Sequence, residues 1–241
     1  MKQIIIRITL VISLVELVIM ICFSQLPHSL GQNTQTVLDV VLLTLVSSPV
    51  IYLWIIKPFV ISRDQALEQL TNMAYKDHLT DLPNRRFLVQ CIEKFIEKSV
   101  KDKFYWALIL IDLDNFKPIN DIHGHNAGDA VLIELSSRMN SILRANDIAG
   151  RVGGDEFIIL LNHLSTDITL AKKEAISISR KLKTLLNEHI IFGDKNLLVG
   201  SSFGICVLGY KEIGVEAAIR EADIAMYRAK KDGKGKIVLF D

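Results

Sequence analysis

The sequence is poor in the features that mark several large protein classes. Only three cysteines occur among its 241 residues, at Cys22, Cys91 and Cys206. They are odd in number, far apart and outside any metal-ligand spacing, so we expect reduced thiols in a protein of the cytosolic side. The formal net charge is only +1, and no basic run with interleaved aromatic residues occurs. A nucleic-acid polymer is therefore not an expected partner, whereas a single nucleotide is compatible with this composition.

Two glycine-rich phosphate-binding loops are also missing. The chain contains neither a Gly-x-Gly-x-x-Gly loop nor a Gly-x-x-x-x-Gly-Lys loop. Ordinary dinucleotide-binding folds and P-loop enzymes are thus disfavoured. No segment suggests a phosphodiesterase domain or a separate sensor domain.

Apolar residues, which make up 50% of the chain, are concentrated before Lys57. Two stretches, Ile8–Leu26 and Val37–Ile56, are each long enough to cross a hydrocarbon core of roughly 30 Å as a helix. No small-x-small cleavage pattern follows the first, which argues against a removed signal peptide. We therefore expect residues 1–56 to be a membrane anchor with two transmembrane helices, at about 8–26 and 37–56.

The distribution of positive charge predicts the orientation of this anchor. The loop between the two stretches, Pro27–Thr36, has no Lys or Arg, whereas Lys2, Arg7, Lys57 and Arg63 flank the other side. By the positive-inside rule, we expect both termini to be cytoplasmic and the loop to face out, as in a multi-pass membrane protein. Glu16 lies well inside the first stretch, where it would either take part in sensing or helix pairing, or pair locally with Ser or Thr hydroxyls.

Residues 57–75 follow as a linker without glycine. Val60, Leu67 and Ala74 are spaced by seven, with Leu70 between them, but Arg63 occupies one expected seam position. The spacing indicates either a signalling helix that pairs with a copy of itself or a plain amphipathic connecting helix.

Residues 76–241 have the pattern of a soluble α/β domain. In Asp77–Arg86, Asp77 or Thr80 is a candidate helix cap, and a helix is expected to start near Arg85. Strands are expected at Tyr105–Ile111, Asp147–Val152, Phe157–Leu161, Leu197–Leu208 and Ile237–Phe240, and further helices at Ala130 to about Leu143, Thr169–Asn187 and Val215–Lys230.

The most unusual chemistry lies at the turn between two of these strands. Gly153 and Gly154 predict a tight hairpin or a close approach of a ligand. Asp155 and Glu156 follow side by side, and adjacent carboxylates repel each other unless a cation or a proton offsets the charge. Acids at the end of a buried strand, as in Asp112-Leu113-Asp114, usually lie at a polar rim or hold a metal. Both a solvated acidic turn and a cation site are compatible with the hairpin alone.

Several motifs together resemble one known family. Gly-Gly-Asp-Glu-Phe, preceded by Asp-Leu-Asp-x-Phe-Lys-x-x-Asn-Asp-x-x-Gly-His-x-x-Gly-Asp, resembles the GGDEF diguanylate cyclases. The Asp-x-Leu-Thr-x-Leu-x-Asn-Arg-Arg opening, Ser202-x-Gly204-Ile205, and Ala222-Asp223-x-Ala225-Met226-Tyr227-x-Ala229-Lys230 fit the same family in the same order. The match covers about Tyr75 to Asp241.

The resemblance implies both a fold and an activity. The fold is a palm-like, nucleotide-cyclase-like α/β domain with a central, mostly antiparallel sheet flanked by helices, here preceded by two transmembrane helices. The activity is the condensation of two GTP molecules into cyclic di-GMP with release of two pyrophosphates, a role in signal transduction. The resemblance also implies a homodimer in which each subunit presents one GTP to the other.

The resemblance further implies a Mg²⁺ site, with Mn²⁺ as an alternative ion. Its ligands would be Asp112, Asp155 and the Leu113 carbonyl, and a pair of rim carboxylates is the alternative reading. Mg²⁺ prefers a few carboxylates plus substrate phosphates, which agrees with this ligand set. Asp155 would accept the proton, Glu156 would support the metal or the substrate, and Lys117 would neutralise phosphate charge in the transition state.

The remaining substrate contacts are also implied by matching positions. Asn120 and Asp129 match residues that read guanine, and an unpaired buried group would then reject adenine. His125 matches a substrate contact, with stabilisation of the turn beside Gly124 as the alternative. Gly153 and Gly154 line the substrate, and Lys230 and Lys234 hold its phosphates. Lys234 departs from the family, which commonly has Gly-Arg-Asn where this chain has Gly-Lys-Gly, so phosphate affinity is in question.

Arg144 and Asp147 match the Arg-x-x-Asp site at which the product inhibits the family. Arg offers a planar fork to phosphate or guanine, and the acid accepts from the guanine edge, although such a pair also occurs by chance on surface turns. The expected function is thus a multi-pass diguanylate cyclase of the bacterial inner membrane, with a cytoplasmic catalytic domain and feedback by cyclic di-GMP. A non-catalytic module that binds GTP or cyclic di-GMP is the main alternative, and a membrane scaffold that only dimerises is a third.

Overall fold

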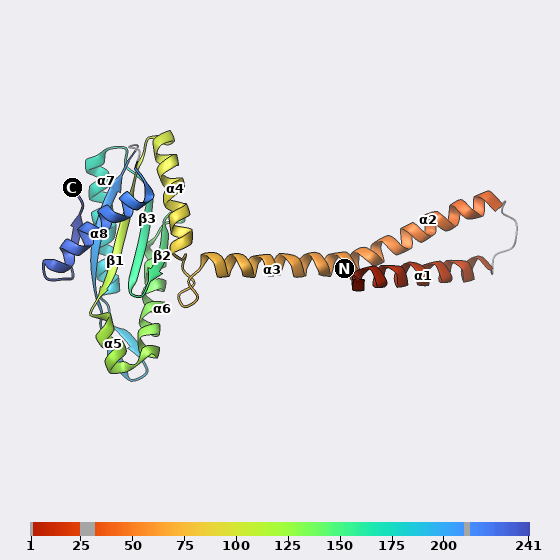
Figure 1. Ribbon diagram of the computed structural model, residues 1–241, viewed down its shortest axis with the longest axis horizontal. Coiled ribbons are helices and arrows are strands. Elements are labelled where there is room, and N and C mark those ends of the chain that lie inside the picture. Colours follow the sequence, from red (N-terminus) through yellow and green to blue (C-terminus); the bar gives the residue numbers. More distant parts are fainter. Residues whose placement is uncertain (1, 25–31, 210–212) are drawn as a thin grey trace. The chain divides into compact units, whose positions relative to one another are not determined.

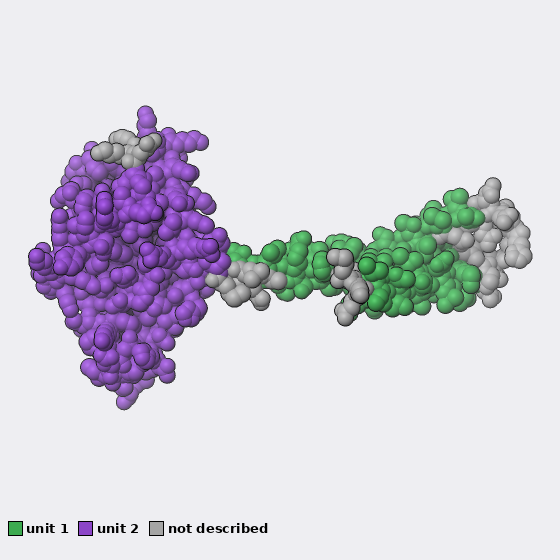
Figure 2. All heavy atoms as spheres, in the orientation of Figure 1, with its two compact units in different colours: residues 1–71 green, residues 72–241 purple. Residues whose placement is uncertain are grey.

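The computed structural model describes residues 2–24, 32–209 and 213–241. The chain divides into two compact units, Met1–Thr71 and Asn72–Asp241 (Figure 2), and each is described by itself. The expected loop from Pro27 lies outside the described residues as far as residue 31, as does Leu26, and so do the side chains of Cys22 and Leu70.

The first unit is helical. Its elements are α1 (Lys2–Ser24), α2 (Gln32–Ile51), the π-helical turn η1 (Tyr52–Ile56) and α3 (Lys57–Tyr75) as far as Thr71, after which the second unit begins within the helix. The helix α2 begins inside the expected Pro27–Thr36 loop. The π-turn follows Pro49, which lies inside α2 and has no N–H for the regular helical hydrogen-bond ladder. Over the described residues, one stretch, Thr36–Gln65, is long and apolar enough to cross a membrane. It contains the second predicted span, and α1 contains the first predicted span as far as Ser24. Both membrane crossings stay predictions. Glu16 is exposed on α1.

The second unit is built on a five-stranded sheet with the order β2-β3-β1-β6-β7 (Figure 1). The strands are β1 (Tyr105–Asp114), β2 (Ile148–Gly153), β3 (Glu156–Leu164), β6 (Gly200–Leu208) and β7 (Ile237–Leu239). All neighbouring pairs are antiparallel except β6 with β7. The predicted α/β fold with a mostly antiparallel central sheet is thus confirmed.

Helices cover both faces of this sheet. They are α4 (Arg85–Asp102), α5 (Phe116–His123), α6 (His125–Ile142), α7 (Ile168–Leu186) and α8 (Val215–Lys231). Side chains alternate along β1 because successive residues of a strand point to opposite faces. Trp106, Leu108 and Leu110 pack with α4 and α8, whereas Ile109 and Ile111 pack with α6 and α7. The even-numbered residues at the end of β1 therefore face α8.

Three local features differ from the sequence-based expectation. The cap of α4 is Asn84, whose side chain accepts from the Phe87 N–H, while Asp77 instead accepts from Thr80. A helix, α5, forms in a polar segment for which no helix was predicted, and its Pro118 is tolerated because first-turn N–H groups have no helical partner. A small hairpin of β4 (Ile190–Phe192) and β5 (Lys195–Leu197) was also missed.

Candidate active site

The strand register brings the two predicted groups of acids together. Asp112 of β1 lies directly opposite Glu156 of β3 in the antiparallel ladder. Directly opposed residues of such a pair point to the same face, with Cβ atoms roughly 5 Å apart. The backbone N–H of Leu113 donates to the Asp155 carbonyl at 3.2 Å, which fixes the hairpin tip against the end of β1. Residues more than forty positions apart in the chain therefore meet at one sheet edge.

The hairpin tip is held by an arginine that sequence reasoning did not assign to the site. Gly154 has a φ of 54°, in the left-handed region that glycine adopts without strain. Arg151 donates from Nε and Nη2 to the Gly154 carbonyl, at 3.0 and 2.8 Å. Its Nη1 forms an ion pair of 2.9 Å with Asp77. Burial acts to raise the pKa of Asp77, but hydrogen bonds from Thr80 and Arg151 outweigh it, so the pKa is lowered.

The acids at this edge perturb one another. Burial raises the pKa of Asp112, and the negative charges of Asp155 and Asp114 add to the shift, which the Lys230 ammonium offsets only in part. Burial also raises the pKa of Glu156, and the charges of Asp112, Asp155 and Asp223 raise it further. The ammonium nitrogen of Lys230, near the end of α8, lies 2.6 Å from a carboxylate oxygen of Asp112. The site thus carries an excess of negative charge that a further cation would relieve.

The donor set is compatible with magnesium rather than with a metal that needs a full protein cage. Within residues 2–24, 32–209 and 213–241, no group of three or more His, Cys, Asp or Glu side chains is arranged to hold a metal ion. Asp112 and Asp155 nevertheless supply two carboxylates at one edge, and Mg²⁺ commonly takes one or two carboxylates and completes its shell with water and phosphate oxygens. The residues therefore fit this ion in the presence of a phosphate substrate.

The predicted guanine-binding residues lie on the two helices that follow β1. Lys117 and Asn120 belong to α5, and His125 and Asp129 to the first turns of α6. The two helices pack closely at Gly128, where an added Cβ would lie 1.9 Å from the Asn120 side-chain oxygen. Lys117, His125 and Asp129 are exposed, and Asn120 is half-buried. The chain thus presents an amide and a carboxylate from neighbouring helices.

The two C-terminal lysines both approach the end of β1. Lys230 pairs with Asp112, as described, and the ammonium of Lys234 donates to the Asn115 side-chain oxygen at 2.8 Å. Gly153 and Gly154 are exposed at the hairpin tip. This edge of the sheet therefore carries three acids, Asp112, Asp155 and Glu156, and two lysines, from β1, the hairpin, α8 and the segment after α8.

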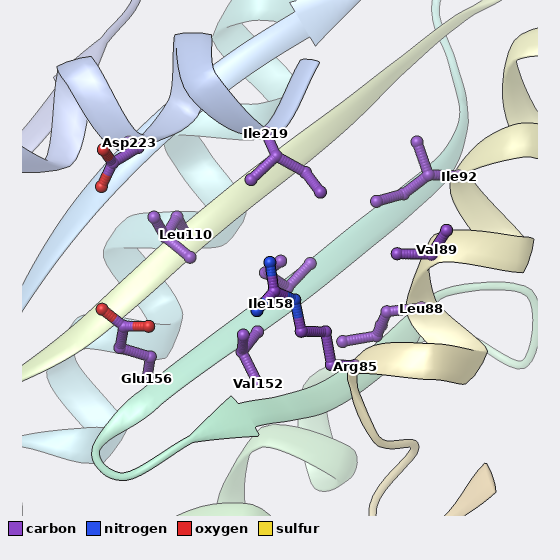
Figure 3. Close-up of a pocket in the computed structure, with 10 residues that line it drawn as sticks. All are labelled: Arg85, Leu88, Val89, Ile92, Leu110, Val152, Glu156, Ile158, Ile219 and Asp223. Carbon is purple, nitrogen blue, oxygen red and sulfur yellow. The ribbon is translucent and has the colours of Figure 1, made fainter. Parts of the chain in front are cut away.

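A small cleft opens beside this edge, on the face covered by α4 and α8 (Figure 3). Its volume is about 140 Å³, below the range of roughly 300 Å³ and more that drug-sized ligands occupy. Its walls are mostly apolar, with Arg85, Glu156 and Asp223 as the charged members. Of the predicted site residues only Glu156 lines it, so the cleft adjoins the acidic edge without containing the other site residues.

Arg144 and Asp147 lie apart from the acidic edge. They precede β2, whereas the hairpin tip follows it, so the length of this strand, roughly 17 Å, separates the two places. Asp147 has a clear structural role: one carboxylate oxygen accepts from the Arg144 N–H at 3.1 Å and the other from the Asn162 N–H at 3.0 Å. The Arg144 side chain is exposed.

Fold and site together define an α/β domain whose sheet edge gathers carboxylates and lysines. The family model described as "Diguanylate cyclase, GGDEF domain" matches residues 74–236. The chain belongs to this family of GGDEF domains.

Two relatives named as diguanylate cyclases are similar to this chain. The chain is 33% identical over 178 residues to the bifunctional diguanylate cyclase/cyclic di-GMP phosphodiesterase MucR of Pseudomonas aeruginosa, covering 73% of this chain and 25% of MucR. It is 34% identical over 169 residues to the diguanylate cyclase DgcP of Escherichia coli, covering 69% of this chain and 48% of DgcP. The chain thus spans half or less of the length of these curated relatives.

Solved structures agree with the fold. The GGDEF domain of TpbB from Pseudomonas aeruginosa has a TM-score of 0.65 and 32% identity, and the similarity covers 69% of this chain and 95% of that one. A microbial GGDEF domain described in an interaction with cyclic di-GMP has a TM-score of 0.61 and 34% identity, covering 70% of this chain and 99% of that one.

Proposed function

We propose that this chain is a diguanylate cyclase, which condenses two GTP molecules into cyclic di-GMP and releases two pyrophosphates. The observation that carries the proposal is the meeting of Asp112 with the Asp155–Glu156 turn at one sheet edge, beside Lys230. Membership of the GGDEF family and the similarity to named diguanylate cyclases support it. An acidic surface turn without a ligand would not need a second acid and a lysine from distant segments.

In the proposed reaction, the 3′-oxygen of one GTP attacks the α-phosphorus of the other. The bond from that phosphorus to the bridging oxygen breaks, and pyrophosphate leaves. The Asp155 carboxylate accepts the proton of the attacking hydroxyl, and Lys117 offsets the charge that develops on the phosphoryl oxygens. A Mg²⁺ ion, or Mn²⁺, held by Asp112, Asp155 and the Leu113 carbonyl would supply charge stabilisation and lower the pKa of the hydroxyl.

We further propose that Asn120 and Asp129 read the guanine edge, with His125 as an additional substrate contact. An amide and a carboxylate satisfy the donor and acceptor groups of guanine, whereas adenine would leave a buried group unpaired. Lys230 and Lys234 would hold the phosphates, and Gly153 and Gly154 would let the substrate approach the backbone closely. In this assignment, Lys230 exchanges its contact with Asp112 for one with a phosphate oxygen.

The symmetry of the product suggests the proposed assembly. Cyclic di-GMP has two equivalent phosphodiester bonds, so two copies of the chain related by a two-fold axis would each present one GTP to the other. Arg144 and Asp147 would then bind cyclic di-GMP as a feedback inhibitor, since Arg144 is exposed and Asp147 is held by two backbone N–H groups. The described interaction of a related GGDEF domain with cyclic di-GMP supports this ligand.

We propose that residues 1–56 anchor the enzyme in the bacterial inner membrane through two spans, with residues 76–241 as the cytoplasmic catalytic domain and residues 57–75 as the linker. The candidate span Thr36–Gln65 supports one crossing. The large apolar side chains exposed along α1, among them Leu10, Leu14 and Met20, support a lipid-facing helix there as well.

A turnover assay on the full chain, purified in detergent, tests the activity. Incubation with GTP and Mg²⁺ should yield cyclic di-GMP, detected by chromatography with mass spectrometry. Asp155→Asn should lower the rate roughly 100- to 10,000-fold, the usual effect of removing a general base. Asp167→Asn is the matched control, because Asp167 caps α7 through the Leu170 N–H and Asn caps equally well. If the chain binds GTP or cyclic di-GMP but forms no product even at concentrations that force dimerisation, it is a non-catalytic binding module.

A further inference from the structure

The second acid at the end of β1, Asp114, is buried and has its hydrogen-bonding capacity used inside the chain. Its side chain faces that of Ser202, and the two residues are 6% and 0% exposed. The Ser202 hydroxyl donates to the Asp114 carboxylate, with oxygen distances of 2.8 and 3.0 Å. The Gly235 N–H donates to the same carboxylate at 2.9 Å and approaches the Ser202 oxygen at 3.1 Å. Asp114 therefore holds a segment more than one hundred residues away in the sequence.

That segment is the cation loop, Gly233–Gly235, which carries Lys234. Its three residues all have positive φ, of 110°, 62° and 58°. Of the three, Lys234 has the strained backbone, because the left-handed region is unfavourable by about 1 kcal/mol for a residue other than glycine. A conformation of this kind persists only where its surroundings determine it.

Contacts on both sides of the cation loop fix its backbone conformation. The Lys234 N–H lies 3.2 Å from the carbonyl oxygens of both Ala229 and Lys230, at the end of α8. Beyond the lysine, Gly235 donates to Asp114 and accepts from the Lys183 ammonium. With its backbone held at both ends, Lys234 extends its ammonium to Asn115, the residue after β1.

The strand register shows why a buried carboxylate fits here. Asp114 lies opposite Gly200 in the β1–β6 ladder. A Cβ on that glycine would lie 3.2 Å from the Asp114 Cβ and 3.3 Å from its carboxylate oxygen, so the glycine leaves the room that the carboxylate occupies. The same ladder sets Asp112 opposite Ser202. One pair of strands thus carries both the proposed metal ligand and the anchor of the cation loop.

We propose that Asp114 and Ser202 are positioning residues that hold the cation loop, and with it Lys234, in the place where the phosphates of GTP bind. They act through the loop and do not touch the substrate. The inference rests on the proposed function, since Lys234 is assigned to phosphate only there. It assigns the two acids of Asp112-Leu113-Asp114 different tasks, the first at the metal and the second behind the phosphate-binding lysine.

The test uses the full chain in detergent and Ser202→Ala, with Ser136→Ala as the matched control. Ser136 is also buried, at 2% exposure, but donates only to the Leu132 carbonyl within its own helix. The loss of hydrogen bonds to a buried carboxylate is worth roughly a factor of 10 or more in an equilibrium constant. Ser202→Ala should therefore weaken the binding of α,β-methylene GTP, which cannot release pyrophosphate, about 10-fold, whereas Ser136→Ala should not change it.

A double-mutant cycle separates positioning from general destabilisation. If Ser202 acts through Lys234, then Ser202→Ala should have little further effect on the Kd once Lys234→Ala is present. Amide exchange of the peptide covering residues 233–236 should also rise about 10-fold in Ser202→Ala, because the Gly235 N–H loses part of its protection. Asp114→Asn should reproduce both effects. Thermal unfolding, monitored by Trp106 fluorescence in a Trp54→Phe background, verifies that each variant is folded.

Two results overturn the proposal: an equal loss of affinity in the presence and absence of Lys234, or unchanged exchange of the cation loop in both variants. Neither depends on turnover, since the binding and exchange measurements use an analogue that does not react. Failure of the parent chain to form cyclic di-GMP would instead refute the proposed activity. The two failures are therefore distinguishable.

Discussion

Glu156→Gln removes one negative charge from the acidic edge while it keeps the shape of the side chain. Glu156 lies directly opposite Asp112, with Cβ atoms roughly 5 Å apart. Two like charges at a comparable separation would repel by about 3 kcal/mol at an effective dielectric constant of 20. Lys230, 2.6 Å from Asp112, cancels much of this repulsion. We expect the substitution to stabilise the fold by about 1 kcal/mol, or about 2–4 °C in Tm for a domain of this size.

The pH dependence follows from the direction of the pKa shift. The pKa of Glu156 is raised in the folded chain by burial and by neighbouring acids, so the folded state binds the proton more tightly than the unfolded state. At low pH, where Glu156 is protonated, the repulsion between the acids does not destabilise the wild type. Its free energy of unfolding falls as the pH rises through the raised pKa of Glu156. The difference between Glu156→Gln and the wild type should be absent at low pH and reach its full size above that pKa.

The assay is thermal unfolding in EDTA from pH 4 to 8, followed by tryptophan fluorescence in a Trp54→Phe background, so that the buried Trp106 is the probe. Glu97→Gln is the control, because Glu97 is exposed on α4 and its loss should change the stability by less than about 0.5 kcal/mol. Added Mg²⁺ should raise the Tm of the wild type more than that of Glu156→Gln, since the ion relieves the same repulsion. If Glu156→Gln melts at or below the wild-type temperature at pH 8, the acids do not repel as described.

Three further predictions concern the frame of the site. Arg151→Ala breaks the half-buried ion pair with Asp77 and should lower the free energy of unfolding by about 2–3 kcal/mol at neutral pH. Because the pKa of Asp77 is lowered in the folded chain, this difference should shrink as the pH falls through that pKa. An acid-unfolding midpoint equal to that of the wild type would contradict this prediction. Gly204→Ala would bring a Cβ to 2.1 Å from a backbone carbonyl of α8 and should cost more than about 3 kcal/mol in chemical denaturation; a cost below 1 kcal/mol would show that α8 packs elsewhere. Gly128→Ala would displace the Asn120 side chain. We therefore expect the preference for GTP over ATP in competition binding to fall about 10-fold or more, with little change in Tm. An unchanged preference would exclude Asn120 as a guanine contact.

Local pattern in the sequence was sufficient for the main elements. The apolar run from Tyr105 predicts a buried strand, and the spacing of apolar residues predicts the helices that cover it. These signals are strong because burial imposes a period of two or of 3.6 residues on any segment that packs on a core. The strand ends were less predictable: β1 continues to Asp114, past the point where polarity suggested a stop, because Asp114 gains partners from β6 and the cation loop.

Elements without such periodicity were missed for the same physical reason. The helix α5 is short and carries Pro118 in its first turn, so its polar, glycine-flanked sequence resembles a loop. Asp77 and Thr80 were the candidate caps of α4, yet the cap is Asn84, because it directly precedes Arg85, where the helix starts. Asp77 instead accepts from Thr80 and pairs with Arg151, a residue 74 positions away that no local window contains.

The sequence by itself determined the class of fold, the hairpin with its two acids and the set of residues on which the proposed chemistry depends, since each is written in a continuous stretch of the chain. Only the tertiary structure decided which of these residues meet. Asp112 faces Glu156 and Ser202 because the strands pair in one register, and a shift of one residue would turn every side chain to the opposite face. The division of tasks between Asp112 and Asp114, and the clamp of Arg151 on the hairpin, follow from that register and from the packing of α8, which the linear order of residues does not reveal.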